Sequence, residues 1–295
     1  MESLLDYGIR VVLWFQQFSP QLDVPFKILT LLGQTFFFLL LMPFLYWCLD
    51  RSMGLRLTIL FLLSAYLNTV AKVLAGQPRP FQYDARVKQL FRAGGGGFPS
   101  GHTQSAVIVW GFLGAQYRNI WMWGIALLLI VFIPLSRIYL GVHFPTDLLG
   151  GYVLGALLLV LYLQLEERVG AWLEKKGFVW QMGVAVVIPF LLLLVFPQGG
   201  KHIIDACATL MGVGAGAALE QKWIRFDSGG LWWKRLSRFL VGGLVLFALW
   251  WGLRILIGGL EPQGFYRFTR YLLTGLWVGA GGPWIFVRTG LADKR

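Results

Sequence analysis

Three polar segments interrupt an otherwise apolar sequence and carry most of the residue types that could catalyse a reaction. They are KVLAGQPRP (72–80), FPSGHT (98–103) and SRIYLGVHFPTD (136–147). Two of the three histidines in the chain, His102 and His143, lie in these segments. Since cations and hydroxyl groups accompany the histidines, the segments predict chemistry on an anionic group such as a phosphate ester.

Hydrolysis of a phosphate ester needs positive charge around the phosphate, a nucleophile and a proton for the leaving oxygen. Lys72, Arg79 and Arg137 could supply the charge, because arginine binds phosphate through two parallel hydrogen bonds and lysine acts as a point charge. Ser100 and Gly101 stand at the predicted start of a helix, where free N–H groups and the helix dipole favour an anion. These five residues are the predicted phosphate ligands.

The spacing of the second histidine suggests a nucleophile. His143 and Asp147 are four residues apart, so they share one face if a helix begins near His143. A carboxylate bonded to one ring nitrogen fixes the tautomer and leaves the other nitrogen free to attack, which makes a phosphohistidine intermediate reasonable. His102 would then be the general acid, and Ser136 is a further candidate hydrogen-bond donor to the phosphate. From the residues alone, the carboxylate partner favours His143 over His102 as the nucleophile.

A metal centre is the alternative use of these side chains. Two histidines and one aspartate could provide three ligands. The three nearby cations would repel a divalent metal ion, however, and we therefore expect a site without metal or cofactor.

The composition is that of a membrane protein. Of the 295 residues, 57% are hydrophobic and only 14% are charged, whereas a soluble domain carries about a quarter charged residues. Apolar runs of about 17–25 residues recur, the length that a helix needs to cross a bilayer, and the sequence lacks the short alternating segments of a transmembrane barrel. It predicts an all-α, polytopic integral membrane protein.

The net charge of +12 does not by itself predict a nucleic-acid partner. The basic residues sit in short connectors between apolar runs and form no continuous stripe. Anionic lipid headgroups and membrane topology account for them more simply. We therefore expect the bilayer, and no nucleic acid, as a partner.

The pattern divides the chain into three parts. Residues 1–20 predict an amphipathic interfacial helix, residues 21–200 a membrane core of six spans, and residues 201–295 an extension of about three further transmembrane helices. A charged connector is expected at 166–176, and spaced glycines in the extension suit close helix packing. The predicted spans are about 28–49, 55–73, 101–117, 120–136, 147–165, 178–196, 203–219, 239–257 and 268–287.

Counting these spans places the three polar segments on one side of the membrane. The first segment ends the second span, the second opens the third span, and the third joins the fourth span to the fifth. On the opposite side lie 14 basic residues, against 9 on the segments' own side outside the motifs. The positive-inside rule therefore predicts a site on the extracytoplasmic face of a plasma or inner membrane, with the C-terminus in the cytoplasm. The 14 are Arg51, Arg56, Arg118, Arg168, Lys175, Lys176, Lys222, Arg225, Lys234, Arg235, Arg238, Arg288, Lys294 and Arg295.

The three segments, in the forms KxxxxxxRP, PSGH and SRxxxxxHxxxD, resemble the signature of the type 2 phosphatidic acid phosphatase, or lipid phosphate phosphatase, superfamily. All three parts match in order. The resemblance implies a six-helix membrane core and a metal-independent phosphatase that works through a phosphohistidine. It implies that His143 attacks, that His102 protonates the leaving group and that Asp147 orients His143. The extension after residue 200 and YWCLDR at 46–51 look more like the sphingosine-1-phosphate-phosphatase-like branch.

The leading hypothesis is thus a membrane phosphatase for the phosphate monoester or pyrophosphate of a lipid, of phosphatidate, phosphatidylglycerol phosphate, sphingoid or polyprenyl type. One alternative is a phosphatase for a soluble phosphate ester. Another is a lipid-binding or transport protein without catalysis, although binding alone would not require two histidines and an aspartate. The sequence leaves the lipid and the oligomeric state open.

Overall fold

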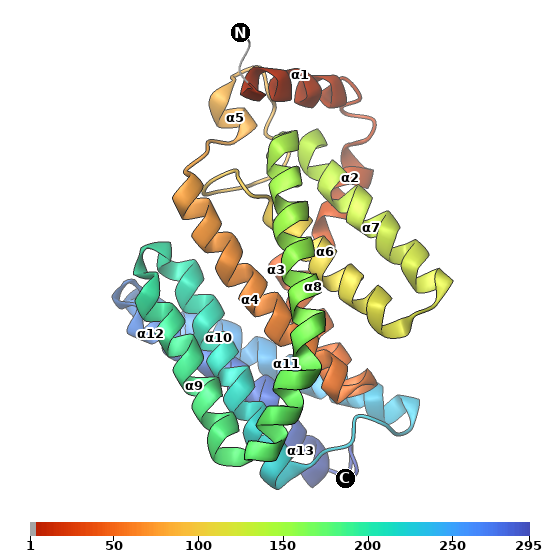
Figure 1. Ribbon diagram of the computed structural model, residues 1–295, viewed down its shortest axis with the longest axis vertical. Coiled ribbons are helices and arrows are strands. Elements are labelled where there is room, and N and C mark those ends of the chain that lie inside the picture. Colours follow the sequence, from red (N-terminus) through yellow and green to blue (C-terminus); the bar gives the residue numbers. More distant parts are fainter. Residues whose placement is uncertain (1–3) are drawn as a thin grey trace. The chain divides into compact units, whose positions relative to one another are not determined.

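The computed structural model describes residues 4–295 (Figure 1). Within that range the chain is almost entirely helical and forms no β-strand beyond an isolated bridge between Phe226 and Lys294. The predicted all-α class is confirmed. The first three residues of the predicted N-terminal segment lie outside the described residues.

The helices follow one another with short connections. They are α1 (Leu4–Gln16), α2 (Asp23–Leu31), α3 (Thr35–Phe44), α4 (Arg51–Ala75), α5 (Pro80–Tyr83), α6 (Gly101–Tyr117), α7 (Ile120–Tyr139), α8 (Pro145–Lys176), α9 (Phe178–Val195), α10 (Gly200–Leu219), α11 (Trp232–Ile257), α12 (Phe265–Leu276) and α13 (Gly282–Arg288). Short π-helical turns extend α3 (Leu45–Leu49) and α10 (Glu220–Ile224), and a third (Trp277–Gly281) joins α12 to α13. Two 3₁₀ turns (Pro197–Gly199 and Gly258–Gln263) complete the helical elements.

Six of the described helices are long and apolar enough to cross a membrane, or seven if the bent pair α2 and α3 forms one span. The predicted arrangement of six plus about three spans also counts α6, which has 17 residues, and the continuous run from α12 to α13. A bundle of such helices satisfies its backbone hydrogen bonds internally, as the bilayer requires. The protein is an integral membrane protein.

The chain forms two compact units. The first comprises residues 1–38 and 67–162, and the second comprises residues 39–66 and 163–295. These units are interleaved in sequence, whereas the predicted division at residues 20 and 200 follows the order of the chain. That division stays a prediction.

The first unit contains all three polar segments, and α1 packs directly against the third of them. Ile9 and Val12 of α1 are buried in a cluster with Phe144 and Leu148. A Cβ atom at Gly8 would lie 2.7 Å from the Phe144 ring, so this glycine permits the close approach of α1. The predicted amphipathic helix therefore buries its apolar side, in part, beside the candidate nucleophile.

Glycines in the second unit allow two helices to pack closely. α10 packs against α9 and α12. A Cβ atom at Gly212 would lie 3.0 Å from the Cα atom of Gly275, and one at Gly216 would lie 2.9 Å from that of Gly279. Small residues at such spacing let two backbones approach closely within a bilayer. The close helix packing predicted from the spaced glycines is confirmed at this pair of helices.

Two expected boundaries are wrong. The span expected at 28–49 is broken after Leu31 and bends by 46° before Thr35. The connector expected at 166–176 is the last part of α8, which continues to Lys176. Its sequence, EERVGAWLEKK, is rich in residues of high helix propensity, and charge alone does not end a helix.

Candidate active site

The three polar segments meet at helix ends within the first unit. The backbone N–H of Ser100 donates to the carbonyl of Asp147 at 2.8 Å, and that of Gly97 donates to the carbonyl of Gln77 at 2.7 Å. The side chain of Gln77 also donates to Asp147 at 2.6 Å, so direct contacts bring the three segments together. The predicted site residues occupy the last turn of α4 (Lys72), the N-cap of α5 (Arg79), the N-cap and first turn of α6 (Ser100, Gly101, His102), the last turn of α7 (Ser136, Arg137), the following loop (His143) and the first turn of α8 (Asp147).

His143 and Asp147 form the central pair of the site. Nδ1 of His143 lies 2.9 Å from Oδ2 of Asp147, and both side chains are almost completely buried. His143 precedes the helix, since α8 begins at Pro145. The contact forms because the Asp147 carboxylate reaches back from the first turn, where it also accepts the N–H of Phe144 at 2.9 Å. This bond is one half of a capping box, in which an acidic side chain in the first turn accepts the free N–H that precedes the helix.

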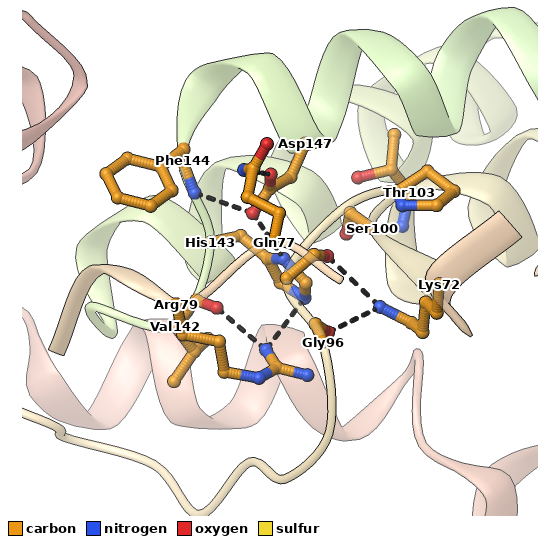
Figure 2. Close-up of polar contacts among 12 residues, drawn as sticks. Lys72, Gln77, Arg79, Gly96, Ser100, Thr103, Val142, His143, Phe144 and Asp147 are labelled. Carbon is orange, nitrogen blue, oxygen red and sulfur yellow. Dashed lines mark hydrogen bonds and ion pairs between the residues drawn. The ribbon is translucent and has the colours of Figure 1, made fainter. Parts of the chain in front are cut away.

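The other nitrogen of His143 faces a cation. Nε2 lies 3.2 Å from Nη1 of Arg79 (Figure 2). A guanidinium can only donate hydrogen bonds, so Nε2 presents its lone pair and the ring proton resides on Nδ1, where it bonds to Asp147. The pair thus holds the tautomer that a nucleophilic histidine needs, with the lone pair directed at a phosphate-binding cation.

A glycine-rich loop holds two of the predicted phosphate ligands. Lys72 donates through Nζ to the carbonyls of Gly96 and Gly97 at 3.0 and 3.1 Å. Arg79 donates through Nε to Gly95 and through Nη2 to Gly94, at 3.1 and 2.9 Å. Its Nη1 atom also donates to the carbonyl of Val142 at 2.7 Å. Both cations are therefore hydrogen-bonded to neutral carbonyl oxygens.

Arg137 and Ser136 at the end of α7 differ in what they contact. Arg137, which is 2% exposed, donates to the hydroxyl of Thr30 and lies over the Phe91 ring, 5.4 Å from its centre. Ser136 donates its hydroxyl to the carbonyl of Ile133 at 2.6 Å, within its own helix. A phosphate contact from Ser136 stays a prediction.

Ser100, Gly101 and His102 form the start of α6, as expected. The Ser100 side chain caps the helix by accepting the N–H of Thr103. A Cβ atom at Gly101 would lie 3.0 Å from the Asn68 side chain, so this turn is tightly packed. The ring of His102 packs against Gly33, where a Cβ atom would lie 2.5 Å from Cδ2. Among the described residues, the buried Nε2 atom of His102 has no hydrogen-bond partner.

The electrostatics of the site suit a dianion. Lys72, Arg79 and Arg137 carry three positive charges, and Asp147 carries one negative charge, which leaves two positive charges. Burial lowers the pKa of His143 well below its usual value, and the charges of Lys72, Arg79 and Arg137 lower it further. The imidazole is therefore neutral and nucleophilic at neutral pH. The same three cations act on His102, which places it within the electrostatic reach of the phosphate ligands.

A metal centre would need clustered His, Cys, Asp or Glu ligands within the part of the chain that the structure describes. There, no three His, Cys, Asp or Glu side chains lie close enough together to hold a metal ion. The independence of the reaction from metal stays a prediction, which chelation tests directly.

Three contributors were missed from the sequence. Gln77 donates to Oδ1 of Asp147 at 2.6 Å, Thr30 contacts Arg137, and the carbonyls of residues 94–97 hold two cations. Gln77 is a polar residue inside the first motif, which could have drawn attention to it. Thr30 lies far from the motifs in sequence, and the carbonyl contacts depend on backbone conformation, so no comparable signal marked either.

Two family models and several curated proteins are similar to this chain. Residues 53–170 match the model of the PAP2 superfamily, and residues 204–294 match that of the PAP2 superfamily phosphatase transmembrane extension. Sphingosine-1-phosphate phosphatase 2 of Mus musculus is 29% identical over 66% of this chain and 56% of its own length. Lipid phosphate phosphatase delta of Arabidopsis thaliana is 27% identical over 64% of this chain and 49% of its own length. Phosphatidylglycerophosphatase B of Bacillus subtilis is 32% identical over 41% of this chain and 62% of its own length.

The chain thus spans about half the length of the first two relatives. The two matched regions together cover more than half of the chain, and they enclose the Lys72–Asp147 site as well as the C-terminal helices. The chain belongs to the PAP2 superfamily.

Proposed function

We propose that this protein is an integral membrane phosphatase that hydrolyses the phosphate monoester or pyrophosphate of a lipid through a phosphohistidine intermediate, without a metal ion. The observation that carries the proposal is the buried His143–Asp147 pair, with the second ring nitrogen of His143 directed at Arg79. A protein that only bound an anionic headgroup would need the cations but not an oriented, neutral imidazole. The pair therefore favours catalysis over binding or transport.

In the first step, Nε2 of His143 attacks the phosphorus atom, and the bond between phosphorus and the ester oxygen breaks. His102, in its protonated form, gives its proton to the leaving oxygen. Asp147 accepts a hydrogen bond from Nδ1–H and stabilises the positive charge that the ring acquires. The products are a phosphohistidine at residue 143 and the leaving group, which is the lipid alcohol from a monoester or the lipid monophosphate from a pyrophosphate.

In the second step, a water molecule attacks the phosphohistidine and the bond between phosphorus and Nε2 breaks. The water loses one proton to His102, which restores the general acid, and inorganic phosphate leaves. His143 returns to the neutral form with its proton on Nδ1. Each group thus ends the cycle in its starting state.

The phosphate ligands act in both steps. Lys72, Arg79 and Arg137 neutralise the phosphate oxygens, while Ser100 and Gly101 offer hydrogen bonds from the start of α6. Ser136 is a further candidate donor. These groups stabilise the charge that develops in the transition state, which is the largest contribution such sites usually make.

The substrate class rests on the membrane helices and on the relatives. Lipid phosphates appear in the names of all three relatives described above. An acyl, sphingoid or polyprenyl chain would lie in the bilayer while its phosphate enters the site. A soluble phosphate ester that reaches the same face is the competing substrate, and an assay panel separates the two.

The orientation in the membrane follows from the basic residues. We assign the site to the extracytoplasmic face of a plasma or inner membrane and the C-terminus to the cytoplasm, because basic residues outside the motifs are more frequent on the side away from the site. Labelling of single cysteines placed at Arg118 and Arg86 by a membrane-impermeant reagent tests this. Only the cysteine at position 86 should react in intact cells.

The central experiment measures phosphate release from a panel of lipid and soluble phosphates by the full chain in detergent with EDTA present. We expect His143→Ala to lower the rate by at least about 10³-fold. The matched control is His202→Ala, the same substitution at the one histidine outside the three segments, which should retain wild-type activity. Full activity of His143→Ala would contradict the nucleophile assignment, and loss of wild-type activity with EDTA would restore the metal alternative.

A further inference from the structure

Gln77 lies between the end of α4 and the start of α5. Its side-chain amide and its backbone carbonyl both form hydrogen bonds in the site. Its side-chain amide donates to Oδ1 of Asp147 at 2.6 Å. Its backbone carbonyl accepts the N–H of Gly97 at 2.7 Å. Figure 2 shows the amide reaching the carboxylate that His143 contacts from the other side.

The amide matters because Asp147 is completely buried. Oδ2 is occupied by Nδ1 of His143 and the N–H of Phe144, whereas Gln77 is the donor to Oδ1 among the described residues. A buried carboxylate oxygen that loses its hydrogen bond costs considerable free energy. The carboxylate would then rotate or take up a proton, and either change removes the acceptor that holds His143.

The backbone contact extends the influence of Gln77 to the cations. Gly97 belongs to the loop whose carbonyls hold Lys72 and Arg79. This loop packs tightly, since a Cβ atom at Gly97 would lie 2.8 Å from the carbonyl of Pro78 and 3.1 Å from Oδ2 of Asp147. One residue therefore fixes the carboxylate and borders the loop around the phosphate ligands.

We propose that Gln77 is a positioning residue, which holds Asp147 in the orientation that His143 requires and links this pair to the glycine loop. The inference rests on the proposed phosphatase function. It predicts that the amide group, rather than the volume of the side chain, is what catalysis needs.

Two substitutions separate these properties. Gln77→Met keeps a similar volume and removes the amide, so we expect kcat to fall about 10- to 100-fold, the effect of losing a hydrogen bond to a charged group, with a smaller change in KM. Gln77→Glu places one carboxyl group against another. Only when the two share a proton can the glutamate donate to Asp147, so this variant should regain activity as the pH falls, while Gln77→Met should not.

The matched control is Gln104→Met. Gln104 is a buried glutamine of α6 whose side chain accepts a hydrogen bond from Asn68 at 2.7 Å. The Gln104→Met variant measures the cost of losing a buried amide that does not contact Asp147. The dependence of its kcat on pH should have the same shape as that of the wild type. Thermal unfolding of each detergent-solubilised variant gives the folded fraction by which its rate is corrected.

The outcomes are separable from those of the proposed function. If the wild type releases no phosphate from any substrate, the phosphatase proposal fails. If the wild type is active and loses activity on His143→Ala, while Gln77→Met stays within about twofold of wild type, the positioning role is overturned. Identical pH profiles for Gln77→Glu and Gln77→Met would overturn it as well.

Discussion

The two compact units both bury cationic side chains, but they neutralise them differently. In the second unit, several arginines pair with carboxylates. In the first unit, the three site cations contact backbone carbonyls, a hydroxyl group and an aromatic ring. The pairs of the second unit are Arg51–Glu220, Arg56–Glu166, Arg267–Asp205 and Arg295–Glu220.

Arg238 is the intermediate case in the second unit. It is completely buried and donates to the carbonyls of Asp227, Ser228 and Gly229. The carboxylates of Asp227 and Asp293 nevertheless act on its charge. Its contacts resemble those of Arg79, but its surroundings contain more negative charge.

The two kinds of contact distinguish charges that stabilise the fold from charges that could bind a ligand. A buried ion pair has its charge neutralised within the protein, and removing one partner leaves the other uncompensated. A cation solvated only by carbonyl dipoles keeps its full charge available for an anionic ligand. Substitutions in the two units should therefore affect different measurements.

Of the substitutions that compare the two units, one at a site cation should change activity most. Lys72→Met removes one site cation at similar volume, and we expect phosphate release to fall about 10²- to 10³-fold, because a group that stabilises developing charge is lost. The melting temperature should change little, since two hydrogen bonds are lost but repulsion from Arg79 and Arg137 is relieved. If the variant unfolds but keeps wild-type activity per folded molecule, Lys72 stabilises the fold and does not take part in catalysis.

The next effect is on stability in the second unit. Glu220→Gln keeps the shape of a completely buried side chain but leaves Arg51 without its anion. We expect unfolding free energy to fall by about 3 kcal/mol, the usual cost of breaking a buried pair from one side, with kcat of the folded fraction unchanged. Thermal unfolding and single-turnover assays measure the two quantities. Asp84→Asn, which breaks the exposed pair with Arg86, is the control and should change neither.

The smallest effect concerns pH. The pKa of His143 is lowered in the folded state, so the unfolded chain binds more protons once the pH falls below about 6.5. Stability should then decrease with falling pH by at most about 1.4 kcal/mol per pH unit from this group. The melting temperature of the wild type should drop more between about pH 7 and about pH 5.5 than that of His143→Asn. If the melting temperatures of the two proteins fall equally with pH, His143 is not held in its neutral form by the folded structure.

The sequence predicted the parts of the site that depend on spacing and on topology. His143 and Asp147 are close in sequence, so their pairing needed only a helix start, and the convergence of the three segments followed from counting spans. Gln77 was not predicted, because its role depends on the path of the chain between α4 and α5. The contact of Thr30 with Arg137 joins residues 107 positions apart, and no local pattern encodes it.

In the fold, too, the features set by local sequence were predicted and those set by tertiary contacts were not. Long apolar runs predicted most helices, since hydrocarbon thickness sets their length. The break between Leu31 and Thr35 was missed because apolar residues flank it on both sides, and hydropathy does not detect a bend. There Gly33 leaves room for the His102 ring, so the break lies where this segment packs against a helix that is distant in sequence.

The carbonyls of residues 94–97 have a consequence for the empty protein. Three cations that share the single carboxylate of Asp147 in a poorly polarisable interior repel one another, and this repulsion would disfavour folding. The loop supplies oxygen atoms to Lys72 and Arg79 before any substrate is bound. These carbonyl oxygens accept the hydrogen bonds that the oxygen atoms of a phosphate group would otherwise accept. Substrate binding at these two residues is then an exchange of one set of oxygen ligands for another, and the affinity that can be measured is only the difference between the two.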